Sequence, residues 1–271
     1  MNNDEKLLKI LQTKNQIVAE REQYVAMANA LAEQARTDLS VPELRLLRYV
    51  LSKVEPDDTA DVDYEIDIRT FLRVCGMATR SGANYNAIKR QIENLWLKHF
   101  WIRDARGKET GIQYILSPTI DIGSGTITVR LDPSIHKYVL NLIHAGRFFK
   151  YRLLYILPMR SEYSIRLYEF LKAGEFKKRT RLVELDELRE RLGCVDIYPN
   201  FKDFRRRALE VAIEEINAYT DIFVAYEPVY RGRAVRGIEF TIRQRHSVAV
   251  ESVMDNDHRT LDGQMDIYDY L

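Results

Sequence analysis

Residues 198–240 read YPNFKDFRRRALEVAIEEINAYTDIFVAYEPVYRGRAVRGIEF, and this stretch decides the fold. Pro199 and Asn200 interrupt the preceding chain, and Asn200 is a suitable N-cap for a helix that begins at Phe201. At about 100° per residue, apolar residues recur along one side of that helix. They are Phe201, Phe204, Ala208, Val211, Ala212, Ile216 and Tyr219. The spacing predicts one long amphipathic helix over residues 200–219.

The order of charge along this helix is unusual. Cations crowd its N-terminal half, namely Lys202, Arg205, Arg206 and Arg207, and acids its C-terminal half, namely Glu210, Glu214 and Glu215. The helix macrodipole favours the reverse order by a few tenths to about 1 kcal/mol per charge. A helix whose first turns enter a DNA major groove needs cations there, because those turns meet base edges and phosphates. The alternative is a solvated face with i,i+4 pairs, Asp203–Arg207 and Arg206–Glu210.

A basic hairpin is predicted after the helix. Short strands over residues 222–226 and 235–242 are joined by residues 228–234, where Gly232 can take the positive φ of a turn. The turn is flanked by Arg231, Arg233 and Arg236. A helix followed by a basic hairpin is the layout of a winged helix, whose wing reaches the DNA backbone or minor groove. An ordinary charged turn is the alternative.

Length and composition bound the class of protein. The chain has 271 residues, enough for one large domain or two of ordinary size. Its 46% hydrophobic and 30% charged residues are typical of a globular rather than a disordered protein. No apolar run reaches the length of a membrane span, and the N-terminus lacks a signal-peptide pattern. Cys75 and Cys194 have no metal-ligand spacing and predict buried thiols in a reducing cytosol.

The net charge of +1 hides an uneven distribution. Residues 1–146 contain 19 Lys and Arg and 19 Asp and Glu. Residues 147–245 contain 21 cations and 15 acids, whereas residues 246–271 contain 1 cation and 6 acids. A basic segment followed by an acidic tail favours a nucleic-acid partner.

The order of predicted elements repeats between the two halves. Each half has a strand, a short helix closed by glycine (Gly76 or Gly193), a long helix and a hairpin. The long helices are residues 84–99 and 200–219, and the hairpins turn at Gly107 and Gly232. The repeat predicts an α+β protein made of two tandem winged-helix domains.

The predicted organisation has four parts. They are an N-terminal extension (1–14), an N-terminal winged-helix domain for association and auxiliary DNA contact (15–145), a C-terminal winged-helix domain as the main DNA reader (146–245), and an acidic, flexible tail (246–271). The first domain is expected to begin with a helix over residues 15–36, and the second with a helix over residues 148–157.

Enzyme motifs are absent from the sequence. It has no phosphate-binding G-x-x-x-x-G-K-[ST] loop, no G-x-S-x-G elbow, and no H-x-H or H-E-x-x-H pair among its five histidines. A tyrosine nucleophile, as in strand-transfer enzymes, is the remaining catalytic hypothesis. Tyr85, Tyr168 and Tyr219 fall on apolar helix faces, which is typical of core tyrosines. We expect a protein with no catalytic residue, no metal and no cofactor.

Several stretches resemble the replication initiator (Rep) proteins of iteron-type, theta-replicating plasmids. The similar stretches are YVAMANAL at 24–31, LRLL at 44–47 with LSK at 51–53, SEYSIRLYEFL at 161–171, and 201–240, which includes AIEEIN at 212–217 and TDI at 220–222. The resemblance covers about residues 15–245. It implies two winged-helix domains that bind repeated origin sites, a monomer that initiates, and a homodimer that represses its own promoter. It also implies that the bound initiator strains A·T-rich origin DNA, which a host helicase then enters, and that host replication proteins, including the host initiator, are recruited.

The resemblance places DNA contacts on both long helices. In the C-terminal domain they are Lys202, Arg205, Arg206 and Arg207, together with the wing arginines Arg231, Arg233 and Arg236. Arg205 projects toward the apolar sector and could pair internally. In the N-terminal domain they are Arg80, Ser81, Asn84, Asn86, Arg90 and Asn94.

The acidic tail contains a short motif similar to the peptide by which bacterial proteins dock on the sliding clamp. Its residues are Gln264, Met265, Asp266, Ile267 and Tyr268. A disordered solubilising tail is the alternative. For the whole chain, the alternatives are a winged-helix repressor with no replication role and a tyrosine-dependent nicking or strand-transfer enzyme. We expect a cytoplasmic bacterial protein associated with the nucleoid or plasmid.

Overall fold

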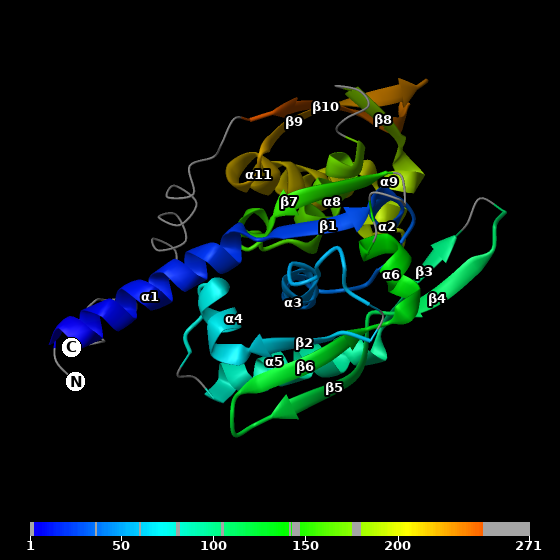
Figure 1. The fold of residues 1–271 in the computed structure, drawn as a ribbon. Helices are drawn as coiled ribbons and strands as arrows, with labels where there is room; N and C mark the ends of the chain where they lie inside the picture. The colour runs from blue at the N-terminus through cyan, green and yellow to red at the C-terminus, as the bar shows by residue number, and fades with distance from the viewer. Residues whose placement is uncertain are drawn as a thin grey trace.

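A computed structural model describes residues 3–35, 37–59, 61–79, 82–103, 106–140, 142, 147–174 and 180–245. Its helices and strands form two winged-helix domains, with the C-terminal domain uppermost and the N-terminal domain below it in Figure 1. The predicted α+β fold of two tandem winged-helix domains is confirmed.

The N-terminal winged-helix domain packs three helices against a three-stranded antiparallel sheet. The helices are α3 (Val41–Leu51), α4 (Ile68–Val74) and α5 (Gly82–Leu97), and the strands are β2 (Asp63–Asp67), β5 (Ile115–Asp121) and β6 (Thr126–Leu131). The sheet order is β2-β6-β5, so the last strand lies in the middle. A 3-10 turn (Pro133–Ile135) and α6 (His136–Val139) follow the sheet.

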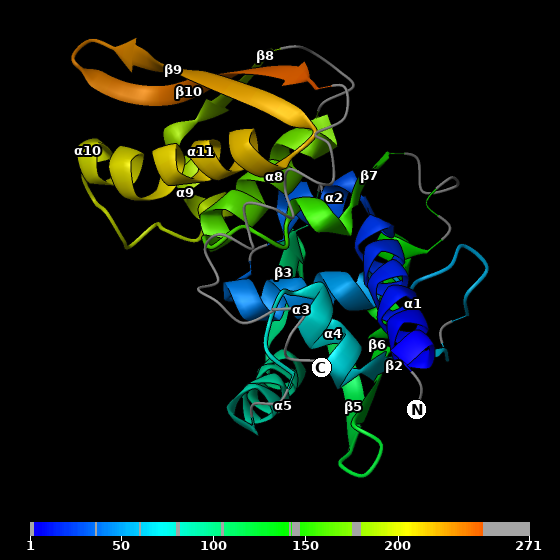
Figure 2. The ribbon, with the colours of Figure 1, turned by 90° about the vertical axis from the view of Figure 1, so that its left-hand side faces the viewer.

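The C-terminal domain has the same plan. Its helices are α8 (Glu162–Gly174), α9 (Leu185–Leu192) and a long helical run of α10 (Phe201–Phe204), a π-helical turn (Arg205–Leu209) and α11 (Glu210–Tyr219). Its strands are β8 (Thr180–Glu184), β9 (Ile222–Arg231) and β10 (Ala234–Gln244), in the order β8-β10-β9. Figure 2 shows this sheet lying over α9 and the long helical run.

Local sequence explains where several helices start and stop. Ser40 and Glu43 form a capping box at the start of α3, and the Asn200 side chain accepts a hydrogen bond from the Asp203 N–H at 2.8 Å. Gly76 and Gly193 follow α4 and α9 with φ of 69° and 73°, a left-handed conformation that favours glycine. These ends match the predicted glycine stops.

The predicted alignment of the two halves is wrong at one hairpin. The hairpin that turns at Gly107, β3 (His99–Arg103) with β4 (Glu109–Gln113), forms a separate two-stranded sheet. The counterpart of the C-terminal wing is instead the β5–β6 hairpin, because β6 pairs with β2 as β10 pairs with β8. β3 and β4 are therefore an insertion between the long helix and the wing, and Figure 1 shows them projecting from the body.

Of the two helices predicted at the starts of the domains, the first is interrupted by a strand and the second is wrong. One helix, α1, covers Asn3–Glu22 and so includes most of the predicted extension; β1 (Tyr24–Ala28) and α2 (Asn29–Gln34) follow it. Residues 148–157 form β7 (Phe148–Arg152) and a 3-10 turn (Leu153–Tyr155). β1 and β7 pair with each other, and this non-local pairing overrides the helical spacing of their apolar residues.

A domain boundary after residue 145 remains a prediction. The pairing of β1 with β7 joins residues from both sides of that boundary. Helix α8 joins the domains further, because it contacts α2 and α3 as well as α9 and α11. The Arg48 guanidinium of α3 donates to both carboxylate oxygens of Glu169 in α8, at 2.6 and 2.8 Å. Both side chains are buried, and the Tyr151 hydroxyl also donates to Glu169. Breaking a buried pair of this kind costs roughly 3–5 kcal/mol.

Candidate nucleic-acid interface

The long helical run of the C-terminal domain contains one extra residue in its π-helical turn, Arg205–Leu209. In an uninterrupted α-helix, Arg205 would lie seven residues before the buried Ala212, within about 20° of the same direction. The wider turn directs Arg205 away from the core, and its side chain is 46% exposed. The preceding Phe204 is buried at 0% exposure. The expectation that Arg205 projects toward the apolar sector is therefore wrong, and the π-turn is the reason.

The π-turn brings three consecutive arginines to the surface, followed by the fully buried Ala208 and Leu209. Arg206 Nη2 lies 3.7 Å from Asp203 Oδ1. The Arg207 guanidinium carbon lies 5.7 Å from the centre of the Tyr198 ring. Lys202 is exposed one turn earlier. The four predicted cations thus lie together on the N-terminal half of the helix.

The ion pairs on this helix differ from the predicted i,i+4 pairs. Arg206 pairs with Asp203, and Arg205 pairs with Glu210 five residues later at 3.3 Å, a spacing that the π-turn makes possible. Glu210 Oε1 also accepts a 3.0 Å hydrogen bond from the Tyr226 hydroxyl on β9. Burial, and then this bond to Glu210, raise the pKa of Tyr226 to about 12, so the hydroxyl stays protonated and donates.

Two of the three acids of the C-terminal half, Glu210 and Glu215, have structural partners that account for their position. Glu215 accepts hydrogen bonds from the backbone N–H groups of Arg160 (2.9 Å) and Ser161 (3.2 Å), just before α8. Glu210 binds Arg205 and Tyr226, as described above, and Glu214 is exposed. Sequence reasoning missed the roles of Glu215 and Tyr226, because both depend on contacts between distant elements.

The wing is longer than predicted. β9 and β10 pair almost to the tip, where Gly232 (φ 65°) and Arg233 form the turn. Arg231, Arg233 and Arg236 are all exposed. Val229 and Tyr230, which sequence reasoning did not single out, are 37% and 61% exposed beside them. Figure 2 shows the turn of this hairpin at the same end of the domain as α10.

This arrangement joins two basic surfaces. We call the long helical run of residues 201–219 the reading helix, after the role that the sequence predicts for it. Its N-terminal half, with Lys202 and the three arginines, and the wing arginines together form what we call the basic face. A helix of about 10–12 Å diameter fits the major groove, and its first turns meet the base edges there. A cationic hairpin beside it can contact phosphates or the minor groove.

The N-terminal domain places its predicted residues differently. Asn86 and Arg90 are exposed on α5. The Asn84 amide donates to the Ala78 carbonyl at 2.7 Å, and Asn94 is exposed on the same helix. Arg80 and Ser81 lie outside the described residues. The outward face of α5 therefore carries less positive charge than the basic face.

The predicted clamp-docking residues 264–268 also lie outside the described residues, as does the whole segment 246–271. Their role stays a prediction.

Of the sixteen tyrosines, the three on the predicted apolar helix faces are at least partly buried. Tyr85 and Tyr219 are half-buried. Tyr168 is fully buried, its hydroxyl donates to Asp221 at 2.8 Å, and burial with the nearby Asp221 raises its pKa well above the usual range. A buried, protonated phenol is a poor nucleophile. Cys75 and Cys194 are buried thiols as expected, and burial raises the pKa of Cys194 to about 11.

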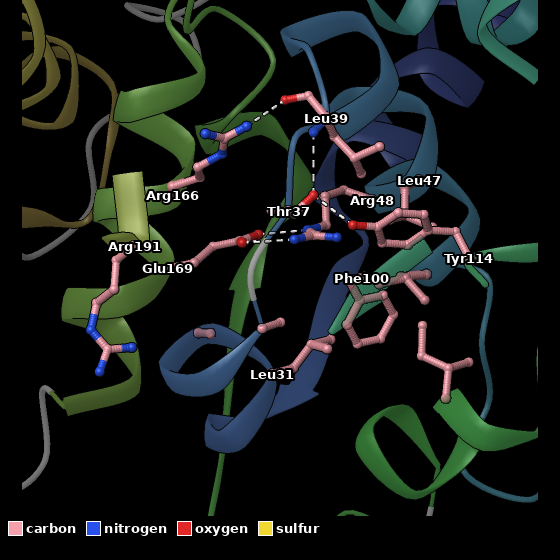
Figure 3. A pocket seen from close by; sticks show the side chains of 14 residues that line it. Leu31, Thr37, Leu39, Leu47, Arg48, Phe100, Tyr114, Arg166, Glu169 and Arg191 are labelled. Carbon is pink, nitrogen blue, oxygen red and sulfur yellow. Dashed lines mark hydrogen bonds and ion pairs between the residues drawn. The ribbon is translucent and has the colours of Figure 1, made fainter. Parts of the chain in front are cut away.

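A small cavity of about 40 Å³ lies at the junction of the domains, beside the Arg48–Glu169 pair (Figure 3). The Tyr114 hydroxyl donates to Thr37 at 2.5 Å, and Arg166 donates to the Leu39 carbonyl at 2.8 Å. This volume suits water molecules rather than a drug-sized ligand. Among the described residues, no group of His, Cys, Asp and Glu is placed to hold a metal ion. No helix in the described ranges is long and apolar enough to span a bilayer.

Comparisons with known proteins agree with this geometry. A family model described as "Initiator Replication protein, WH1" matches residues 24–172, and one described as "Initiator Rep protein, WH2" matches residues 184–242. The PI protein of Escherichia coli is 30% identical over 133 residues, which cover 43% of this chain and 43% of that protein. This chain therefore matches less than half the length of that curated relative.

The fold is shared with a solved structure, described as the crystal structure of Pi initiator protein in complex with iteron DNA. The TM-score is 0.72 at 20% sequence identity, over 84% of this chain and 99% of that one. At this identity the similarity concerns the fold, two winged-helix domains in sequence.

Proposed function

Because the chain belongs to the family of initiator replication proteins, we propose that it is a plasmid replication initiator that binds repeated origin sites (iterons) in a sequence-specific way. The basic face is the observation that carries this proposal. It places four cations on the first turns of an exposed helix and three more on a neighbouring wing. The similar fold of an initiator described in complex with iteron DNA supports the same assignment.

The proposed function depends on the free energy of DNA binding and not on a catalysed reaction. Cations that neutralise phosphates release counterions, which makes affinity fall steeply with salt. Arginines that contact guanine in a bidentate manner each contribute about 1–3 kcal/mol of discrimination. Neighbouring bound copies then strain the adjacent duplex, and a host helicase enters it. The protein itself acts without a catalytic residue, metal or cofactor.

The finer assignments follow from the resemblance to plasmid initiators. A monomer binds the iterons, and a homodimer binds the operator of its own promoter through the same C-terminal reader. Host replication proteins, namely a helicase, the host initiator and the sliding clamp, are its partners at the origin. It acts in the bacterial cytoplasm on plasmid DNA. α5, with Asn86 and Arg90 exposed, makes the auxiliary DNA contact.

A gel-shift salt series on DNA from the plasmid's own origin tests the proposal. The wild-type protein should give a ladder on repeated sites, and Arg206→Ala/Arg207→Ala should lose it. The matched control is Lys150→Ala/Arg243→Ala, which removes two exposed cations from β7 and from the end of β10 away from the wing turn. Equal loss in both double variants, or wild-type binding that ignores sequence, would overturn the proposal.

Two further outcomes separate the rival functions. A repressor without a replication role would bind its promoter but give no ladder on origin repeats. A tyrosine-dependent nicking enzyme would leave nicked or covalently linked DNA after incubation with supercoiled plasmid and a divalent metal.

A further inference from the structure

The contact between Arg205 and Glu210 differs from an ordinary surface ion pair, because a third residue from another element holds the carboxylate. Glu210 Oε1 lies 3.3 Å from Arg205 Nε and accepts the Tyr226 hydroxyl hydrogen bond at 3.0 Å. Tyr226 lies on β9 opposite the fully buried Phe240 of β10, so its ring position is defined by the sheet. The carboxylate therefore connects the reading helix to the strand that leads into the wing.

A second side chain, Asn217, connects the reading helix to β9 through two hydrogen bonds. The Asn217 amide donates to the Val224 carbonyl at 2.9 Å, and its oxygen accepts from the Val224 N–H at 2.7 Å. Helix α11 is thus held to β9 at two points separated by about two helical turns. The reading helix is therefore attached to the first half of β9, the strand that leads into the wing.

An acid at this place is unfavourable for simple phosphate attraction. Glu210 directly follows the π-turn that carries the three arginines, and its side chain is 38% exposed, so its negative charge weakens non-specific binding to DNA. Its contact uses Nε of Arg205, and a guanidinium has five N–H donors in a planar fork. Four donors thus stay available for a base edge or phosphate. A fork that is already oriented loses less side-chain freedom on binding.

We propose that Glu210 is a positioning residue, which orients Arg205 for base recognition and is itself held by Tyr226 of the wing strand. The inference rests on the proposed function and deepens it. Arg205 then reads sequence, whereas exposed cations such as Lys202 add affinity for any duplex. The negative charge of Glu210 lowers affinity for any duplex, whereas its contact with Arg205 raises the preference for origin sites over other sites.

The test compares Glu210→Gln with Glu214→Gln, which removes the same charge from an exposed position one turn later on the helix. Each variant is titrated with origin-repeat duplex and with a scrambled duplex of equal length, at two salt concentrations. Glu214→Gln should tighten both complexes by the same factor and leave their ratio unchanged. Glu210→Gln should lower the ratio of origin to scrambled affinity by about 10-fold, a magnitude typical of one oriented arginine–base contact.

Two more variants separate positioning from general damage to the fold. Arg205→Ala should lower the ratio about as much as Glu210→Gln, and the double variant should lower it no further, because both act through one contact. Tyr226→Phe keeps the ring and removes the hydroxyl, so it should lower the ratio by a smaller factor, about 3-fold. Thermal melting of each variant is measured as well. If the residues only stabilised the fold, their removal would lower the melting temperature and the affinities for both duplexes together.

The outcomes distinguish this inference from the proposed function. If the wild-type protein prefers origin DNA and Glu210→Gln keeps that preference, or if the Arg205→Ala and Glu210→Gln effects add, the inference is overturned and the proposed function stands. If the wild-type protein shows no preference for origin DNA, both are overturned.

Discussion

The two winged-helix domains share a plan and differ in their long helices. Their sheets have equivalent orders, β2-β6-β5 and β8-β10-β9, and both long helices follow a short helix closed by a left-handed glycine. α5 is a regular α-helix that exposes Asn86 and Arg90. The C-terminal helix contains a π-turn and exposes three consecutive arginines. One extra residue in a helix has thus changed which side chains a common scaffold presents.

The wings differ as well. The C-terminal wing turns at Gly232 among arginines, whereas the β5–β6 turn of the N-terminal domain has the sequence DIGSG at 121–125 and exposes Ile122. The N-terminal domain also has the inserted β3–β4 hairpin, on which Trp101 is 47% exposed. From this difference we expect the C-terminal domain to make most of the phosphate and base contacts.

The largest expected effect concerns the anchor of the π-turn. Phe204→Ala removes a fully buried ring and should lower the free energy of unfolding by about 3–5 kcal/mol, measured by urea denaturation. Ile88→Ala, at a fully buried position in α5, should cost about 2–5 kcal/mol. At a temperature where both variants are folded, Phe204→Ala alone should lower the preference for origin DNA. Equal preference in both would show that the π-turn does not depend on Phe204.

The next effect concerns the bonds from each long helix to its surroundings. Asn217→Ala removes both hydrogen bonds that the amide makes to the Val224 backbone, and should lower the free energy of unfolding by about 1–3 kcal/mol. Asn84→Ala in α5 removes one exposed bond to the Ala78 carbonyl and should cost less than about 0.5 kcal/mol. Thermal melting ranks the two variants, and the reverse order would contradict the attachment of the reading helix to β9.

The wings should differ in binding rather than in stability. Arg231→Ala/Arg233→Ala should weaken origin binding about 10-fold and reduce the slope of log affinity against log salt by roughly 0.9 for each phosphate that is no longer neutralised. Ile122→Ala in the other wing should leave affinity and slope unchanged. A gel-shift salt series measures both affinity and slope. A salt slope in the double variant equal to that of the wild-type protein would show that the wing arginines do not contact phosphates.

The smallest expected effect concerns α5. Arg90→Ala should weaken origin binding by no more than about threefold, because the N-terminal domain supplies an auxiliary contact. The same gel-shift series measures it. A loss of affinity greater than that of the wing double variant would identify the N-terminal domain as the main reader.

Sequence patterns predicted the features that depend on neighbouring residues. Asn200 caps the long helix as its side chain suggested, and Gly193 and Gly232 have the positive φ expected of a helix stop and a hairpin turn. The cations of residues 202–207 are exposed on one half of that helix. Each of these follows from capping, backbone freedom or periodicity within a few residues.

Features that depend on distant contacts were not predictable in the same way. The apolar residues of β1 have a spacing that also fits a helix, and only pairing with β7 decides for a strand. The π-turn turns Arg205 away from the core, and the regular helical spacing of the sequence gives no sign of it. Glu215 looked like one acid of a charged face, although it accepts the backbone N–H groups before α8. The β3–β4 hairpin resembles a wing in sequence, and only the pairing of β6 with β2 shows that β5–β6 is the wing.

Helix α8 has a consequence for any dissection of this chain into fragments. It is the first helix of the C-terminal domain, and its Tyr168 and Lys172 side chains bind Asp221 at 2.8 and 2.7 Å. It also carries Glu169, the buried partner of Arg48 in the other domain. A fragment that starts at residue 184 would lack this helix, and one that starts at Glu162 would expose the buried carboxylate to water. We therefore expect the two domains to unfold together, and limited proteolysis to release neither as a stable piece.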